Sequence, residues 1–86
     1  MAEITIYTSA FCGHCLRAKT LLKAKHAAFD EIDVVADPSR RAEMIKRAGG
    51  RSTVPQIFIG GRHVGGSDDL ARLNQTGELD RMLRAG

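Results

Sequence analysis

The chain has 86 residues, of which 43% are hydrophobic and 27% charged, an ordinary composition for a small globular domain. No apolar run approaches the ~20 residues of a membrane-spanning helix, so we expect one domain over residues 1–86 that does not enter a membrane. The 13 basic and 10 acidic residues give a net charge of +3, but no basic run is dense and aromatic residues are few, which argues against nucleic-acid binding.

The first part of the chain predicts a strand, a helix and a second strand. Residues 3–8 alternate apolar and polar side chains, as half-buried strands do. A helix is expected to begin at Cys12 or Gly13 and to end near His26, whose partial positive charge suits a helix C-terminus. Residues 29–35 predict a strand short enough to run parallel to the first. The predicted helix would bury a stripe formed by Cys15, Ala18, Leu21, Leu22 and Lys25.

A second helix is expected after residue 37. Asp37 can cap its N-terminus, Pro38 suits its first turn, and Gly49-Gly50 ends it. Its apolar spacing is carried by Ala42, Ile45 and Ala48.

The last third predicts a hairpin followed by helix. Residues 56–59 and 62–64 flank Gly60-Gly61, a pair that can adopt the positive φ angles of a tight turn. Ser67, Asp68 and Asp69 can cap a third helix, which Gly77 should break before residues 78–84. The element order β-α-β-α-β-β-α predicts an α/β fold of the thioredoxin-like architecture, a four-stranded mixed sheet with helices on both faces.

Both cysteines of the chain, Cys12 and Cys15, stand three positions apart at the junction of the first strand and helix. A disulfide that closes so short a loop stabilises a fold by only about 2 kcal/mol, against more than ~4 kcal/mol for a long loop. At a helix N-terminus, by contrast, unpaired backbone N–H groups and the helix dipole stabilise a thiolate. The pattern therefore predicts a redox pair in which Cys12 is the nucleophile.

Zinc is the competing interpretation of the cysteine pair. A closed zinc site needs four ligands, and beyond the cysteines the chain offers only His14, His26 and His63. His14 lies between the cysteines and cannot easily share a tetrahedron with both, and the other two are not at zinc-finger spacing. We expect no metal site of this kind. With the cysteines in a redox arrangement, and with neither a basic leader nor the apolar core of an export signal at the N-terminus of the given sequence, the reducing cytoplasm is the expected compartment.

Motifs along the chain, taken with the dithiol, resemble one protein family. They are Ile6-Tyr7-Thr8, Arg17-Ala18-Lys19 with Leu21-Leu22, Glu43-Met44-Ile45-Lys46-Arg47, Thr53-Val54-Pro55-Gln56-Ile57-Phe58-Ile59 and Gly65-Gly66-Ser67-Asp68-Asp69-Leu70. From Ile4 to Leu83 the chain resembles a glutaredoxin of the bacterial dithiol type, within the thioredoxin-like superfamily. The resemblance implies a glutathione-dependent thiol–disulfide oxidoreductase.

The resemblance also implies where glutathione is bound. Pro55 would be a cis-proline beside the cysteines that leaves the backbone of Val54 free to pair with a peptide, whereas from the residues alone it could simply begin an edge strand. Gly66, Ser67 and Asp68 would receive the γ-glutamyl end of glutathione, and Ser67 and Asp68 could be plain helix caps instead of, or in addition to, this role. Arg41 would meet its glycine carboxylate. His14 and Thr53 complete the expected contacts.

Three departures from the family pattern bear on chemistry. Gly13 and His14 replace the common proline and tyrosine, and the glycine loosens the first helical turn. His14 either makes the dithiol more oxidising or is a solvent-exposed spacer. Ser9 and Ala10 stand where many relatives have a lysine that binds glutathione and favours the thiolate. Part of this work would fall to Arg41, Arg51 or Lys19, or else the affinity for glutathione would be lower. Ser67 replaces an extra cysteine of some members.

The expected mechanism divides the work between the cysteines. Cys12 would attack the glutathionyl sulfur of a mixed disulfide, and Cys15 would resolve the intermediate formed with protein disulfides. Expected partners are glutathione and glutathionylated or disulfide-bearing proteins, with the chain a monomer. Two alternatives stay open: a dimer that shares an iron–sulfur (2Fe–2S) cluster between the Cys12 thiolates and two glutathiones, and a redoxin reduced by thioredoxin reductase.

Overall fold

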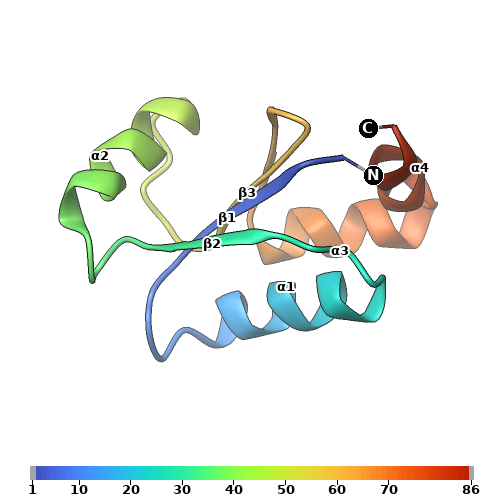
Figure 1. Ribbon diagram of the computed structural model, residues 1–86, viewed down its shortest axis with the longest axis horizontal. Helices are drawn as coiled ribbons and strands as arrows, with labels where there is room; N and C mark the ends of the chain where they lie inside the picture. Colours follow the sequence, from blue (N-terminus) through green and yellow to red (C-terminus); the bar gives the residue numbers. More distant parts are fainter. Residues whose placement is uncertain (1, 86) are drawn as a thin grey trace.

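The computed structural model describes residues 2–85, and its elements follow the predicted order along the chain (Figure 1). A four-stranded sheet carries helices on both faces, as expected from the sequence. None of its helices is long and apolar enough to cross a membrane within residues 2–85. The elements are β1 (Ile4–Thr8), α1 (Gly13–Ala24), β2 (Asp30–Asp33), α2 (Pro38–Arg47), β3 (Gln56–Ile59), β4 (Arg62–Gly65), α3 (Ser67–Thr76) and α4 (Glu78–Arg84).

The strand pairing brings distant segments of the chain together at one end of the two central strands. The spatial order is β2-β1-β3-β4, with β1 and β2 parallel and the other two pairs antiparallel. Tyr7, near the end of β1, lies opposite Gln56, the first residue of β3. The segment that leaves β1 therefore meets the segment that enters β3, although they are about fifty residues apart in sequence.

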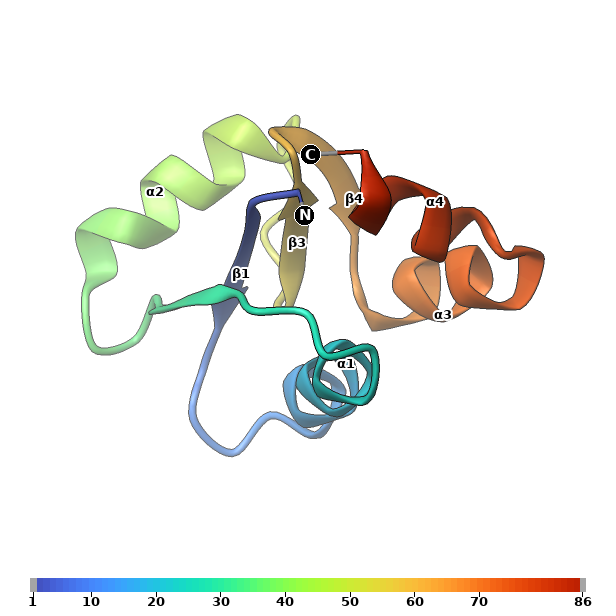
Figure 2. The ribbon, with the colours of Figure 1, turned by 45° about the vertical axis from the view of Figure 1, so that its right-hand side comes forward.

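The two faces of the sheet bury separate hydrophobic clusters, because successive strand side chains point to opposite faces. Figure 2 shows α2 on one side of the sheet and α1 and α3 on the other. Ile4 and Ile6 of β1 pack with Leu22 of α1 and Leu70 of α3. Tyr7 packs on the opposite face with Phe58 of β3, Met44 of α2 and Ala48, which follows α2 directly. The alternation of β1 thus supplies both layers of the core.

The second strand is shorter than the predicted 29–35. It ends at Asp33, whose carboxylate accepts hydrogen bonds from the backbone N–H groups of Val35 and Ala36 at 2.8 and 3.0 Å. An aspartate that binds the backbone in this way turns the chain and ends a strand. Val34 is buried beyond the strand and Val35 is exposed.

The buried face of α2 differs from the predicted one. Met44 is fully buried and Ala42 is exposed, while Ala48 is buried and Ile45 half-buried as expected. Met44 and Ala48 are four positions apart and share a face, whereas Ala42 lies two positions from Met44, on the far side of a helix with ~3.6 residues per turn. The expected cap by Asp37 is also wrong in detail: its carboxylate accepts from the Ser39 hydroxyl at 2.6 Å and not from the helix backbone.

The end of α1 has a left-handed residue that sequence analysis missed. The helix ends at Ala24, and His26 follows with φ +56°. The N–H of Ala27 binds the carbonyl of Leu22 and the N–H of His26 binds that of Lys23, both at 3.0 Å, which is the Schellman arrangement. Lys25, expected in the buried stripe, is half-buried, and its Nζ pairs with Asp80 at 2.8 Å.

Replacing His26 by glycine is expected to stabilise the protein by about 1 kcal/mol, because a Cβ is disfavoured in the left-handed region and glycine has none. Urea unfolding of the reduced protein measures the change in free energy. His26→Ala removes the ring but keeps the Cβ and should show no gain. An equal gain from both variants would place the strain in the imidazole instead of the backbone.

Candidate active site

The two thiols occupy different environments at the start of α1. Cys12 is the N-cap residue, half-buried, and its Sγ accepts a hydrogen bond from the backbone N–H of Cys15 at 3.1 Å. As a thiol it donates to the carbonyl oxygen of Val54 at 3.9 Å. Cys15 is 1% exposed, inside the first turn. The sulfur of Cys12 thus takes the place of a capping oxygen, where the helix N-terminus favours negative charge.

The environment of Cys15 keeps its thiol protonated. Burial, followed by the hydrogen bond and charge of Cys12, raises the pKa of Cys15 to about 11. Burial disfavours the charged form of any thiol, and a neighbouring thiolate adds to the effect. At neutral pH the dithiol therefore consists of one accessible sulfur and one buried thiol that holds its proton.

Alkylation should separate the two thiols. With iodoacetamide in modest excess at about pH 8, we expect one modification per chain, at Cys12, because Cys15 is buried and protonated. Peptide mass mapping locates the label, and in denaturant both cysteines should be modified. Labelling of Cys15 before Cys12 would contradict the arrangement.

The loop that leads into β3 lies beside Cys12. The Val54–Pro55 peptide bond is cis, as the family resemblance implies, and Pro55 is buried. The Gln56 side chain is fully buried, and its Nε2 donates to the carbonyl of Thr53 at 3.0 Å and to its Oγ1 at 3.3 Å. Its Oε1 therefore faces Nε2 of His63, at 2.7 Å. Gln56 and His63 hold this loop, and neither was predicted to do so.

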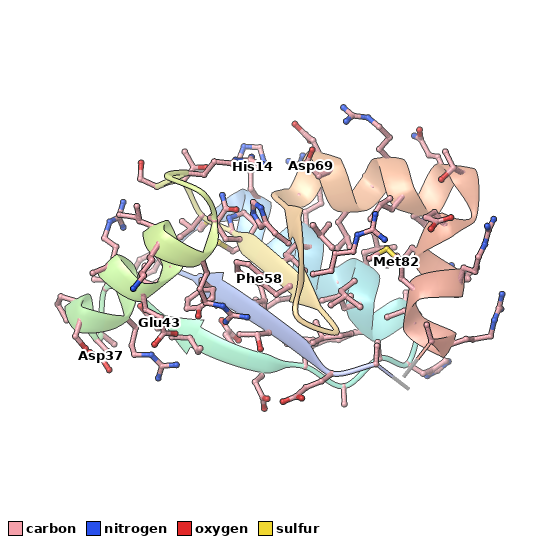
Figure 3. The ribbon with its side chains drawn as sticks, turned by 90° about the horizontal axis from the view of Figure 1, so that it is seen from above. His14, Asp37, Glu43, Phe58, Asp69 and Met82 are labelled. Carbon is pink, nitrogen blue, oxygen red and sulfur yellow. The ribbon has the colours of Figure 1, made fainter. Side chains whose placement is uncertain are left out.

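A cavity of about 360 Å³ opens beside this loop. His14 of α1 and Asp69 of α3 project at the same edge of the molecule (Figure 3). Seven of the eight residues predicted to contact glutathione line this cavity, namely His14, Thr53, Val54, Pro55, Gly66, Ser67 and Asp68. The eighth, Arg41, lies outside the lining; its Nη2 donates to the carbonyl of Ser52 at 3.0 Å. Arg51, which was expected to take over part of the work of the missing lysine, also lines the cavity, as do Asp69 and Arg72, which were not predicted.

The N-terminus of α3 forms one wall of this cavity. Gly66 is the N-cap, and the carboxylate of Asp69 accepts from the Gly66 N–H at 2.8 Å. This bond, with Arg51 at 3.3 Å, lowers the pKa of Asp69. The capping alternative for Ser67 and Asp68 is therefore wrong, since Asp69 provides the cap. A Cβ at Gly65, where φ is +118°, would collide with the Asp69 carboxylate, so glycine is required there.

Figure 3 also shows Phe58 in the middle of the sheet and Glu43 on α2. Tyr7 donates its hydroxyl proton to Glu43, and Arg47 donates to the Tyr7 oxygen at 2.8 Å. The Arg47 guanidinium lies 4.1 Å from the centre of the Phe58 ring, and the His63 ring stacks on Phe58 at 5.0 Å. This polar and aromatic cluster connects α2 to the residues that hold the Thr53 loop.

Metal ligands do not gather anywhere in the part of the chain that the structure describes. Within residues 2–85 no three histidine, cysteine, aspartate or glutamate side chains come close enough to hold an ion.

Comparison with known proteins gives concordant results. The glutaredoxin family profile matches residues 4–64. The chain is 49% identical to Glutaredoxin 3 of Escherichia coli K12 over 84 residues, which cover 98% of this chain and all of that protein. The solution structure of a glutaredoxin from Brucella melitensis is 54% identical, with a TM-score of 0.84 over 96% of this chain and 89% of that one. The buckwheat glutaredoxin–glutathione complex is 29% identical, with a TM-score of 0.88 over 96% and 77% of the two chains.

Proposed function

The chain belongs to the glutaredoxin family of glutathione-dependent disulfide oxidoreductases, and from this premise we propose how its residues divide the reaction. The observation that carries the proposal is the position of the Cys12 sulfur. It receives the Cys15 N–H at the start of α1 and lies 3.9 Å from the Val54 carbonyl, at the loop that lines the cavity. A nucleophilic sulfur and a binding wall are thus provided by two segments that the sheet brings together.

In the first reaction the Cys12 thiolate attacks the glutathione sulfur of a glutathionylated protein. A Cys12–glutathione disulfide forms, and the protein sulfur leaves with the electron pair and takes a proton from water. A second glutathione thiolate then attacks the glutathione sulfur on Cys12, releases glutathione disulfide and restores the Cys12 thiolate. Cys15 takes no part in this reaction, because the incoming glutathione resolves the intermediate.

Protein disulfides need the second thiol. The Cys12 thiolate attacks one sulfur of the substrate disulfide, and the other substrate sulfur leaves with the electron pair and takes a proton from water. Cys15 then loses its proton to water and attacks the Cys12 sulfur, which forms the internal disulfide and releases the second substrate thiolate. Two glutathione molecules reduce the internal disulfide, releasing glutathione disulfide. Burial is the largest cause of the raised pKa of Cys15, about 11, and the hydrogen bond and the charge of Cys12 are the other two. Both effects weaken once Cys12 is bound in a mixed disulfide, so the pKa of Cys15 falls at the step where its thiolate is needed.

The cavity beside Cys12 is the proposed glutathione site. The α-carboxylate of the γ-glutamyl group would bind backbone N–H groups at the N-terminus of α3, near Ser67, and its ammonium would pair with the exposed Asp68 carboxylate. Val54 would pair through its backbone with the cysteinyl part. Arg51, which lines the cavity, and Arg41, which binds the carbonyl of Ser52 outside the lining, carry positive charge for the glycine carboxylate.

Replacing Asp68 by asparagine is expected to raise the KM for glutathione about tenfold, the loss of one charge-assisted hydrogen bond. A coupled assay with glutathione reductase and a glutathionylated peptide measures this value. Asp30→Asn, an exposed aspartate on β2 outside this cavity, is the matched control and should leave the KM unchanged. Equal effects of the two variants would mean that overall charge, not the α3 wall, determines the KM.

The proposed partners are glutathione and proteins with glutathionylated or disulfide-bonded cysteines, and the proposed compartment is the cytoplasm, where glutathione keeps thiols reduced. The choice of reductant tests this part directly. Turnover with glutathione and glutathione reductase, and none with thioredoxin reductase alone, is the expected result. Turnover with thioredoxin reductase alone would instead identify the rival redoxin.

The cluster-binding alternative needs ligands that one chain alone does not supply. Cys12 is accessible and Cys15 is buried, so one chain presents one usable thiol, and a 2Fe–2S cluster would need the Cys12 of a second copy and two glutathione thiols. Gel filtration and visible absorbance after anaerobic reconstitution distinguish a coloured dimer from a colourless monomer. We propose the monomeric oxidoreductase as the principal function.

A further inference from the structure

Phe11, the residue before the nucleophile, is the most exposed large apolar side chain among residues 2–85. Its relative exposure is 108%, and its backbone has φ +59°, a region that bulky residues rarely occupy. The loop between β1 and α1 lies at the edge of the molecule, away from α4 (Figure 1). The ring makes no contribution to the core, and it stands next to the sulfur that every substrate must reach.

A second cavity, of about 510 Å³, lies beside Phe11 and shares no lining residue with the proposed glutathione cavity. Cys12 and Cys15 line it together with Leu16, which is 64% exposed. Two separate hollows thus flank the start of α1. One can receive glutathione while the other remains open beside the same sulfur.

The charged residues that line the second cavity give it a net negative charge. Lys19 pairs with Glu31 at 3.0 Å, which leaves the Asp33 carboxylate as the unbalanced charge of the lining. An aromatic side chain at a surface is a typical anchor for a protein partner, and a carboxylate in the lining selects partners with basic side chains.

We propose that Phe11 and Leu16 form a docking surface for protein substrates whose reactive cysteine is flanked by a large apolar side chain and a basic one. This inference deepens the proposed function and rests on it. A protein substrate is the expected occupant because Phe11, Leu16 and the reactive Cys12 line the same cavity. A substrate cysteine that reaches Cys12 brings its neighbouring residues to this surface. The exchange itself is unchanged, since Cys12 forms the new S–S bond and the substrate sulfur leaves with the electron pair. Phe11 is a positioning residue.

Four glutathionylated peptides test the surface. They place leucine or serine before the cysteine and arginine or glutamate after it, and glutathionylated cysteine is the small substrate. We expect kcat/KM to be about tenfold higher for the leucine–arginine peptide than for the serine–glutamate peptide, the effect of burying one leucine at a weakly acidic site. Phe11→Asn, which tolerates the positive φ, should reduce this ratio to about twofold and leave glutathionylated cysteine unchanged.

Two further variants make the test specific. Phe11→Tyr keeps the ring and should keep the preference, and Val35→Ser removes an exposed apolar side chain outside the cavity and should also keep it. An equal loss for all substrates in Phe11→Asn, or a preference unaffected by it, would overturn the docking surface. Absence of turnover of glutathionylated cysteine by the unaltered protein would instead refute the proposed function, so the two failures are distinguishable.

Discussion

Replacing Cys12 by serine is expected to abolish both the reduction of protein disulfides and the removal of glutathione from proteins. A serine hydroxyl remains protonated at neutral pH and cannot form the mixed disulfide, so the loss should be roughly a thousandfold or more. The N–H of Cys15 that now binds Sγ can still bind an oxygen, because serine is a preferred N-cap residue. The fold should therefore survive the loss of activity.

The measurement is the turnover of a glutathionylated peptide and of a disulfide-bonded protein by the same preparation. Circular dichroism and urea unfolding show whether Cys12→Ser retains the structure and stability of the unaltered chain. Retained turnover in the folded variant would overturn the assignment of Cys12 as the nucleophile.

Replacing Cys15 by serine is expected to divide the two activities. Removal of glutathione needs only Cys12 and an incoming glutathione, so its rate should stay within about threefold. Reduction of protein disulfides should fall by about a hundredfold, because no neighbouring thiol resolves the mixed disulfide and a second glutathione must do so. The substrate should accumulate as a covalent complex with Cys12, detectable by non-reducing electrophoresis.

The Cys15→Ser variant also shows whether the buried thiol supports the reactivity of Cys12. Cys15 is 1% exposed and holds its proton, so its removal leaves the accessible sulfur and the capping hydrogen bond from the backbone in place. Loss of both activities in Cys15→Ser would mean that the buried thiol supports the nucleophile itself. Retention of both would mean that glutathione resolves every intermediate and that Cys15 has no chemical role.

Local patterns in the sequence were enough to predict where most strands, turns and helices of this protein begin and end. The alternation of residues 3–8, the positive-φ pair Gly60-Gly61 and the break at Gly77 each depend on near neighbours, and each was found where expected. The position of Cys12 at the start of a helix is also local. These features predicted the element order, the mixed sheet and the accessible nucleophile.

Other features depended on which elements the fold brings together. The choice of Met44 over Ala42 for the core was decided by how α2 lies on the sheet, since periodicity allowed several faces. Asp69, and not Ser67 or Asp68, caps α3. Because Gly65 has no Cβ and a φ of +118°, the Asp69 carboxylate can approach the Gly66 N–H. A local pattern of polar residues does not distinguish these candidates.

The site itself is the clearest case of tertiary determination. Arg51 and Arg72 line the proposed glutathione cavity, and Gln56 and His63 hold the Thr53 loop, but these residues come from separate strands, loops and helices. Sequence spacing indicates which residues share a helix or a strand. The antiparallel pairing of β1 with β3 decides which of them meet at Cys12. It places Gln56 opposite Tyr7, at the end of the sheet from which the chain continues to the dithiol.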